Sequence, residues 1–177
     1  MSTVLDAKLN VVREILRAAG SSVVAYSGGA DSALVLSIAH EVLGERCVAL
    51  TGASDSLPAD ELDAARRTAE AIGARQVVVA TREMDDPRYL ANAPDRCYWC
   101  KSELHERTTA WARENGFACV LDGLNADDDP RDRPGVRAGH EHGVRSPLRE
   151  AGITKDEVRE LSRRRGLPTW DEPAAPC

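Results

Sequence analysis

The sequence predicts a single α/β domain built on a doubly wound parallel sheet. Short runs rich in valine and alanine alternate with helical patterns along most of the 177 residues. The runs, which are the candidate strands, cover residues 22–26, 47–51, 76–80 and 118–122. The helical patterns cover residues 4–19, 32–43, 58–72 and 98–115. Helices between successive strands favour right-handed crossovers, which make the sheet parallel and cover both of its faces.

The loops after the candidate strands are the first places to look for a site, because an open parallel sheet binds ligands at the carboxyl ends of its strands. A further loop, rich in aspartate, arginine and proline, is expected over residues 125–135. The last helix is expected to begin at Thr154, because Thr154 and Glu157 have the spacing of a capping box. It should run to Arg165 and stop at Gly166.

Composition limits the class of protein. Apolar residues make up 42% of the chain and charged residues 29%, which is typical of one soluble domain. No apolar run reaches the length of about eighteen residues that a membrane helix needs, and the N-terminus lacks a secretory signal, so we expect a cytoplasmic protein without membrane contact. The net charge of −6 argues against nucleic acid as a partner. The five cysteines are expected to be ligands, nucleophiles or core residues rather than disulfides.

An anion site is expected between the first candidate strand and the helix after it, in the segment Tyr26-Ser27-Gly28-Gly29-Ala30-Asp31-Ser32. Two successive glycines allow positive φ angles and close approach of a ligand to the main chain. The amides and the positive end of the helix dipole suit pyrophosphate. Asp31 would repel phosphate unless magnesium bridges the two. The alternative is an ordinary turn in which Asp31 caps the helix.

This segment carries the SGGxDS signature of the PP-loop ATP pyrophosphatases, and the chain resembles that family. The resemblance implies the PP-loop, or adenine nucleotide alpha hydrolase-like, type of parallel sheet. It also implies the family's chemistry. ATP is cleaved between the α- and β-phosphates, a carboxylate or carbonyl oxygen is adenylated, and a nitrogen or sulfur nucleophile displaces AMP.

Further segments resemble one branch of that family, the sulfur transferases that mature the nickel-pincer nucleotide of lactate racemase (the LarE family). The resemblance rests on residues 122–128, 133–135, 141–148, 155–159, 166–168 and 170–177. It implies an enzyme that adenylates a carboxylate of pyridinium-3,5-biscarboxylic acid mononucleotide and replaces its oxygen with sulfur. The family's chains continue into a further domain, so residues 1–177 are expected to be the ATP pyrophosphatase domain, with that C-terminal domain absent.

The resemblance also implies roles for individual residues. Contacts with the phosphates and the adenosine of ATP are expected from Ser27, Gly28, Gly29, Asp31, Ser32, Ser54 and Gly123. Magnesium is expected on Asp31 together with Asp127 or Asp128. The catalytic set is expected to be Asp31, Arg145, Lys155 and Cys177, with the two basic residues offsetting negative charge on phosphate or substrate. The alternatives are solvated loop charges for the aspartates and an exposed helix start for Lys155.

Sulfur transfer needs a sulfur nucleophile, and Cys177 is the first candidate. In part of the family, a cysteine at this position gives up its own sulfur and becomes dehydroalanine. This chain also carries Cys97 and Cys100 at the start of a predicted helix that Asp95 could cap. Three thiolates match the ligand set of an iron–sulfur cluster with one open iron. By resemblance, Cys97, Cys100 and Cys177 would hold a [4Fe-4S] cluster whose free iron carries the sulfur.

Other readings of the cysteines stay open, because a CxxC pair also occurs in zinc sites and redox pairs. A zinc site would need a fourth ligand, for which His105, His140 and His142 are candidates. Otherwise His140 and His142 are expected to be exposed in a polar loop. The remaining cysteines, Cys47 and Cys119, are expected to be buried in strands.

Two other functions also stay open. The first is a different PP-loop ligase, either an ammonia-dependent synthetase or a tRNA thiolase. The second is a truncated, non-catalytic ATP-binding domain. The expected partner is the pyridinium mononucleotide, a small molecule, and a homo-oligomer is possible.

Overall fold

A four-stranded parallel sheet forms the centre of the protein, whose computed structural model describes residues 3–173. The strand order is β3-β2-β1-β4, and the strands are β1 (Ser22–Ala25), β2 (Cys47–Ala53), β3 (Arg75–Ala80) and β4 (Cys119–Leu121). Each strand begins within one residue of its predicted start, which confirms the parallel sheet. β1 pairs with β2 from Ser22 opposite Cys47 to Ala25 opposite Leu50. On its other side, β1 pairs with β4, from Ser22 opposite Cys119.

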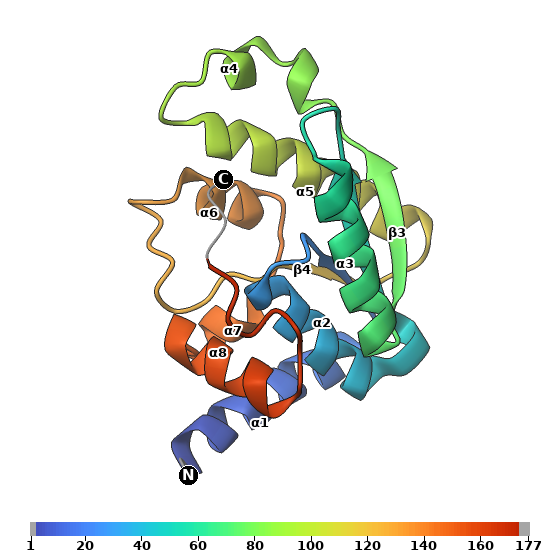
Figure 1. Ribbon diagram of the computed structural model, residues 1–177, viewed down its shortest axis with the longest axis vertical. Helices are drawn as coiled ribbons and strands as arrows, with labels where there is room; N and C mark the ends of the chain where they lie inside the picture. Colours follow the sequence, from blue (N-terminus) through green and yellow to red (C-terminus); the bar gives the residue numbers. More distant parts are fainter. Residues whose placement is uncertain (1–2, 174–177) are drawn as a thin grey trace.

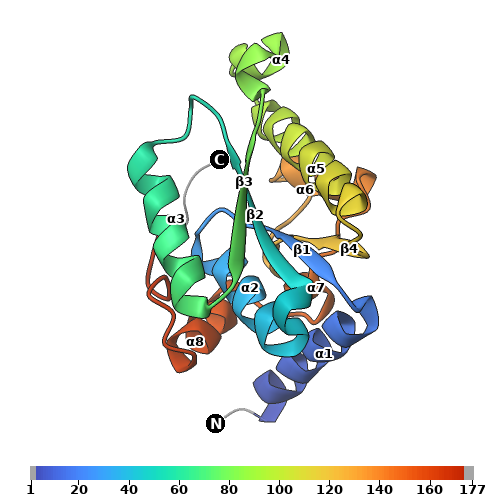
Figure 2. The same ribbon diagram turned by 90° about the vertical axis from the view of Figure 1, so that its right-hand side faces the viewer.

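Helices cover both faces of the sheet, as expected for a doubly wound fold (Figures 1 and 2). One face carries α1 (Thr3–Ala19), α2 (Ala30–Leu43), α3 (Ala59–Ile72), α7 (Pro147–Glu150) and α8 (Lys155–Arg164). The other face carries α5 (Arg96–Glu114) and α6 (Pro134–Glu141). Short elements connect these layers: η1 (Gly44–Arg46), η2 (Glu83–Asp85) and α4 (Pro87–Leu90). None of the helices within residues 3–173 is long and apolar enough to cross a membrane.

The apolar core is divided between the two faces of the sheet. The larger cluster packs α1, α2 and α8 against the sheet, and its fully buried side chains include Leu16, Leu34, Ile38, Leu148 and Leu161. α2 is apolar around most of its surface because it lies between the sheet and the helices α1 and α8. The smaller cluster packs α5 against the sheet and consists of Val23, Leu50, Ala112 and Val120.

The C-terminal helix begins as predicted. The Thr154 side chain accepts a hydrogen bond from the Glu157 amide, and the Glu157 carboxylate accepts one from the Thr154 amide. This capping box fixes the first residue of α8, Lys155, relative to the loop before it. The helix ends at Arg164, and the chain turns at Gly166, as its sequence indicates.

Some local predictions were wrong. Asp95 occupies the N-cap position of α5, but its carboxylate accepts a hydrogen bond from the indole of Trp99 (3.0 Å) instead of from a helix amide. His140 belongs to α6 rather than to a polar loop, although it is exposed as expected. His142 is half-buried rather than exposed, and its ring makes a hydrogen bond with the Ser102 hydroxyl (3.0 Å). Cys47 is buried as expected, whereas Cys119 is only half-buried.

Candidate active site

The loop between β1 and α2, residues 27–32, has the backbone of an anion site. Gly28 has a φ of +90°, which side chains rarely tolerate, and Gly29 is the N-cap of α2 without a side-chain cap. The first amides of α2 therefore lack an intramolecular side-chain acceptor, and the positive end of the helix dipole lies with them. We call residues 27–32 the phosphate loop. Asp31 lies within the first turn of α2, so the alternative in which it caps this helix is wrong.

Packing against α3 holds the phosphate loop close to the sheet. A Cβ atom at Gly28 would lie 2.7 Å from Cβ of Ala65, so only glycine is accommodated there. The Tyr26 hydroxyl donates a hydrogen bond to the Ala65 carbonyl (2.9 Å). Within the loop, the Ser27 and Ser32 hydroxyls lie 3.2 Å apart, and the Gly29 amide donates to Ser27 Oγ (3.3 Å). The loop is thus held in shape before any ligand binds.

The strand order places this loop at a branch point of the sheet. β1 and β4 are neighbours, but the chain leaves β1 toward α2 on one face and reaches β4 from α5 on the other. The order of the strands along the sheet thus reverses between β1 and β4, and open α/β sheets bind ligands at such a point. The loop after β4 approaches α2 very closely. A Cβ atom at Gly123 would lie 2.8 Å from the Ser32 amide nitrogen.

Asp31 is the centre of a polar network that joins three loops. Its Oδ1 accepts a hydrogen bond from the Asn125 side-chain amide (3.1 Å), and its Oδ2 pairs with the Lys155 ammonium (2.5 Å). The backbone amide of Lys155 donates to the Asp127 carboxylate (2.8 Å). The structure thus brings together Asp31, Asp127 and Lys155, which are far apart in the sequence. Asn125 is a fourth member that the sequence did not indicate.

Asp128 lies nearby but stabilises the loop. Its side chain is buried. Its carboxylate accepts a hydrogen bond from the Asn125 backbone amide (2.9 Å) and pairs with Arg133 (2.9 Å). Both carboxylate oxygens are thus engaged inside the segment that follows β4. Of the two expected magnesium ligands, Asp127 is therefore the better placed.

Ser54 lies at the carboxyl end of β2, as predicted. Its hydroxyl contacts the buried carboxylate of Glu83 (2.5 Å), a residue that follows β3. Arg145 lies elsewhere. Its guanidinium pairs with Glu150 (2.5 Å), while its backbone extends the sheet beside β4 through a bridge to Leu121.

Comparison with known proteins identifies the family. Residues 6–128 match the family model described as asparagine synthase. The chain belongs to this family of PP-loop ATP pyrophosphatases.

Individual relatives agree with this assignment. The chain is 46% identical over 173 residues to an uncharacterized protein of Synechocystis, covering 98% of this chain and 65% of the relative. It is 38% identical over 153 residues to the pyridinium-3,5-bisthiocarboxylic acid mononucleotide synthase of Lactiplantibacillus plantarum, covering 86% and 55%. The chain thus spans roughly half to two thirds of the length of these relatives.

Solved structures share the fold. The U34-tRNA thiolase NcsA of Methanococcus maripaludis, solved with its [4Fe-4S] cluster, superposes with a TM-score of 0.72 at 19% identity, covering 98% of this chain and 68% of that one. The NH3-dependent NAD synthetase of Campylobacter jejuni superposes with a TM-score of 0.69 at 14% identity, covering 95% and 75%. At these identities the likeness shows the fold of the PP-loop proteins and nothing finer.

The first turn of α5 carries the cysteine pair of this PP-loop protein. Cys97 and Cys100 are both half-buried, and α6 packs against this part of α5. A Cβ atom at Gly135 of α6 would lie 3.2 Å from Cys97 Sγ, so glycine there allows the close approach. Cys177, the third expected ligand, lies outside the described residues. Within residues 3–173, no group of three or more histidine, cysteine, aspartate or glutamate side chains has the arrangement of a metal site.

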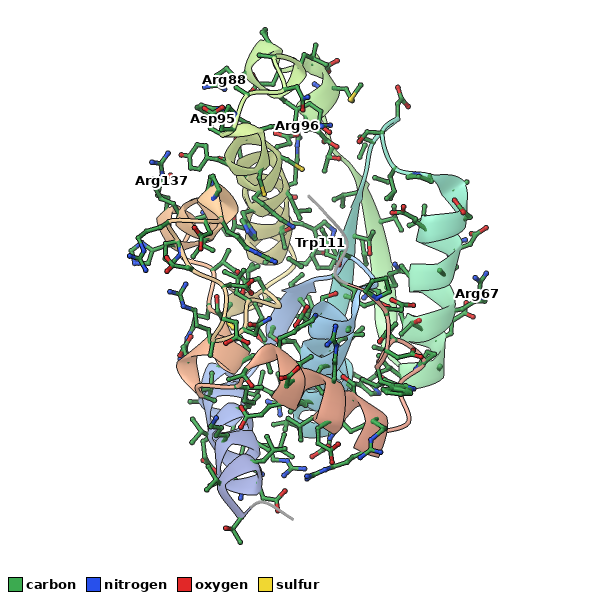
Figure 3. All side chains as sticks on the ribbon, turned by 60° about the vertical axis from the view of Figure 1, so that its left-hand side comes forward. Arg67, Arg88, Asp95, Arg96, Trp111 and Arg137 are labelled. Carbon is green, nitrogen blue, oxygen red and sulfur yellow. The ribbon has the colours of Figure 1, made fainter. Side chains whose placement is uncertain are left out.

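Aromatic and arginine side chains surround the exposed side of this turn. The Arg88 guanidinium lies 3.7 Å from the ring centre of Trp99, and that of Arg137 lies 4.4 Å from the ring centre of Tyr98. Figure 3 shows Arg88, Asp95 and Arg96 together at this end of α5, while Trp111 lies further along the helix toward the sheet. These contacts fix the two aromatic rings on the protein surface.

Two buried titratable groups lie between the cysteine turn and the phosphate loop. Burial, with smaller effects from Lys101 and His142, lowers the pKa of His105 to about 3, so its ring is neutral. Burial raises the pKa of Asp122 above its usual range, and hydrogen bonds from Ser146 and the Leu124 amide offset part of this effect. Both groups face Gly139 of α6, whose Cβ position would lie 3.3 Å from Asp122 Oδ2 and 3.4 Å from His105 Nε2. Asp122 was not among the predicted site residues, although an aspartate directly after a strand is a signal for a site.

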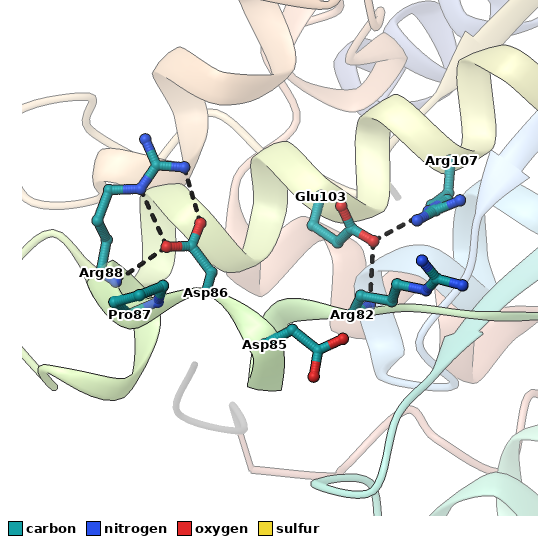
Figure 4. A pocket seen from close by; sticks show the side chains of 7 residues that line it. All are labelled: Arg82, Asp85, Asp86, Pro87, Arg88, Glu103 and Arg107. Atoms are coloured by element: carbon teal, nitrogen blue, oxygen red, sulfur yellow. Dashed lines mark hydrogen bonds and ion pairs between the residues drawn. The ribbon is translucent and has the colours of Figure 1, made fainter.

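A wide surface depression lies apart from the phosphate loop. It is lined by residues of η2, α4 and α5 and by the segments beside them (Figure 4): Arg82, Asp85, Asp86, Pro87, Arg88, Glu103 and Arg107. Four of its charged side chains are paired with one another, because Asp86 pairs with Arg88 and Glu103 pairs with Arg107. Glu103 also accepts a hydrogen bond from the Arg82 backbone amide. We therefore place the active site at the phosphate loop and not in this depression.

Replacing Gly28 by alanine should abolish ATP binding and lower the free energy of unfolding by about 1–3 kcal/mol or more. The new Cβ would strain a positive φ angle and overlap Ala65, which displaces the phosphate loop. The matched control is Gly116→Ala, because Gly116 has a φ of +76° and open space around it. Calorimetric titration with ATP measures the affinity, and urea unfolding measures the free energy of unfolding. Equal ATP affinity in the two variants would contradict the geometry.

Replacing Lys155 by methionine should weaken MgATP binding about tenfold, because a cation beside Asp31 is lost from the phosphate site. The control is Lys8→Met. The Lys8 side chain has a similar exposed fraction, but it pairs with Glu157 (2.8 Å) and not with Asp31. Both variants should lose a similar, small amount of stability, up to about 1 kcal/mol. Isothermal titration with MgATP distinguishes the two variants by their affinity. An unchanged affinity in Lys155→Met would refute the role of this lysine.

Proposed function

We propose that this protein is an ATP-dependent sulfur transferase acting on pyridinium-3,5-biscarboxylic acid mononucleotide. In the reaction, a substrate carboxylate attacks the α-phosphate of ATP, pyrophosphate leaves, and the acyl adenylate forms. A sulfur nucleophile then attacks the acyl carbon, AMP leaves with the C–O bond electrons, and a thiocarboxylate remains. The observation that carries the proposal is the phosphate loop at the branch point of the sheet, with Asp31 and Lys155 beside it. The 38% identity to the L. plantarum synthase supports the choice of substrate.

Residues of the phosphate loop perform the first half of the reaction. The amides of residues 28–32 and the Ser27 and Ser32 hydroxyls bind the phosphates of ATP. Lys155, now paired with Asp31, offsets their negative charge. Asp31 and Asp127 supply carboxylate oxygen atoms of the type that magnesium prefers, and both contact Lys155, while the side-chain amide of Asn125 donates to Asp31. Bound magnesium would neutralise charge on the phosphates as pyrophosphate leaves.

The second half of the reaction depends on the cysteines. Cys97 and Cys100, one turn apart on α5, can supply two thiolates on the same side of this helix. With Cys177 as the third, they match a [4Fe-4S] cluster that leaves one iron open. Such a cluster would present sulfide to the acyl adenylate. In the alternative, Cys177 gives up its own sulfur, and the enzyme acts once.

Two further points concern the extent of the protein and its alternatives. We propose that residues 1–177 are the ATP pyrophosphatase domain, since the named synthase is longer than this chain.

The fold shared with NcsA favours tRNA thiolation as a second candidate function, because that thiolase contains a [4Fe-4S] cluster. The net charge of −6 disfavours it, since binding tRNA depends on basic groups that neutralise phosphates.

The function is tested by pyrophosphate release. With MgATP, sulfide and the pyridinium dicarboxylate nucleotide, the protein should release pyrophosphate and form a thiocarboxylate detected by mass spectrometry. Asp31→Asn should slow this release at least about 100-fold, because it removes a carboxylate that would hold magnesium at the phosphates. Release with unmodified tRNA in place of the pyridinium nucleotide would favour the thiolase. If the protein binds ATP but releases no pyrophosphate with either acceptor, only a nucleotide-binding domain would remain as its function.

The cluster is tested by anaerobic reconstitution with iron and sulfide. Wild-type protein should bind about four irons and four sulfides and show the broad absorption of a cluster. Cys97→Ala should lose both, whereas Cys119→Ala should retain both, because Cys119 is the first residue of β4, opposite Ser22, and not part of the cysteine pair at the start of α5. If all three proteins bind the same amount of iron, or if none of them binds iron, Cys177 itself would be the sulfur source.

A further inference from the structure

Glu83 is a buried carboxylate that the proposed reaction does not use. It lies in η2, directly after β3, and only 8% of its surface is exposed. Its Oε1 accepts a hydrogen bond from the Ser54 hydroxyl (2.5 Å) and lies 3.3 Å from the Ser56 hydroxyl. An acidic side chain is rarely buried unless its partners compensate for the loss of water. The partners here are hydroxyl groups of the loop after β2.

The charge state of Glu83 follows from these partners. Burial alone would raise its pKa, but hydrogen bonds from Ser54, Thr81 and Ser56 bring the pKa below the usual value. Glu83 is therefore ionised near neutral pH. An ionised carboxylate can only accept hydrogen bonds.

This charge fixes the direction of two serine hydroxyls. The Ser54 proton is directed to Glu83. The Ser56 hydroxyl, 2.7 Å from Ser54 Oγ, directs its proton either to Ser54 or to Glu83, and both lie inward. Each hydroxyl has one proton, so neither has one left for a ligand. Ser54 Oγ also accepts a hydrogen bond from the Ser56 amide (3.2 Å), so most of the free lone pairs lie on Ser56 Oγ. The side chains of Ser54 and Ser56, the serine pair, therefore present lone pairs, chiefly those of Ser56, and no proton to a molecule that binds over the loop.

The serine pair is placed to meet the base of a bound nucleotide. β1 and β2 run side by side, and the Tyr26 amide donates to the Leu50 carbonyl just before the phosphate loop begins. β2 continues to Ala53, so Ser54 lies about 10 Å further along the strand direction than Thr51, at about 3.3 Å per residue. A nucleotide whose phosphates lie on the phosphate loop can span this distance along the carboxyl edge of the sheet.

We propose that Glu83 is a specificity-determining positioning residue, which makes the serine pair accept hydrogen bonds and so selects a 6-amino purine over a 6-oxo purine. Adenine offers an amino hydrogen at C6, which the serine oxygens can accept. Hypoxanthine and guanine offer a carbonyl oxygen there, which would face lone pairs and lose the hydrogen bonds it made to water. The inference rests on the proposed use of ATP, and it adds the means by which the base is chosen.

The test compares ATP with ITP, whose base has a carbonyl oxygen in place of the amino group at C6 and a hydrogen on N1. Wild-type protein should bind ATP about tenfold more tightly than ITP. In Glu83→Gln, the amide can donate a proton to Ser54, so the serines can turn their own protons outward. The ratio of the ATP and ITP dissociation constants should then fall to within about threefold. A merely structural role would weaken both nucleotides together and leave the ratio unchanged.

Two further variants make the result decisive. Asp86→Asn is the matched control, because Asp86 follows η2 but pairs with Arg88 (Figure 4), and it should keep the wild-type ratio. Ser54→Ala combined with Ser56→Ala removes the acceptors and should lower the ratio even if Glu83→Gln fails to fold. ATP binding with an unchanged ratio in this double variant would overturn the inference and leave ATP use intact. Wild-type protein that binds neither nucleotide would overturn both.

Discussion

The site depends on the contact between Gly123 and the first turn of α2. A side chain at Gly123 would overlap the Ser32 amide, so the loop after β4 can lie on α2 only because this residue is glycine. From there the chain reaches Asn125, whose side chain binds Asp31, and the Ala126 amide donates to the Ile153 carbonyl (2.7 Å) just before α8. The strand order brings the loops after β1 and β4 together, and this close approach turns their proximity into one site.

Charge in the site is balanced locally. The start of α2 is positive, which favours an anion but also favours a carboxylate at Asp31. Lys155 compensates that carboxylate, and the capping box of α8 holds the lysine at the first position of its helix. In the proposed reaction, phosphate and magnesium would exchange partners with Asp31 and Lys155, so each charge would keep a partner of opposite sign. The pair is neither deeply buried nor fully exposed, with 28% and 21% of its side chains accessible, so such an exchange costs little.

The sequence predicted the features that depend on local pattern. The strands, the glycine turn between β1 and α2 and the capping box follow from apolar runs, successive glycines and the spacing of Thr154 and Glu157, and the structure has all three. The short helices were missed, although Pro87, Pro134 and Pro147 stand at their first positions, where proline is favoured. Partners brought together by folding were out of reach: Asn125 with Asp31 and Ser54 with Glu83. No periodicity records which side chains meet across separate loops.

The seam between α5 and α6 relates the sulfur chemistry to the phosphate loop. Cys97, Lys101 and His105 are spaced four residues apart on α5, and the first two face Gly135 while His105 faces Gly139. Glycines let the two helices approach, so His105 and Asp122 are buried beside α6, and burial lowers the pKa of His105 and raises that of Asp122. Cys97 and Lys101, nearer the start of α5, are only half-buried. Asp122 precedes Gly123, so this row of side chains connects the cysteine turn with the first turn of α2. In the proposed reaction, this row is the part of the structure that joins the sulfur source to the phosphate loop.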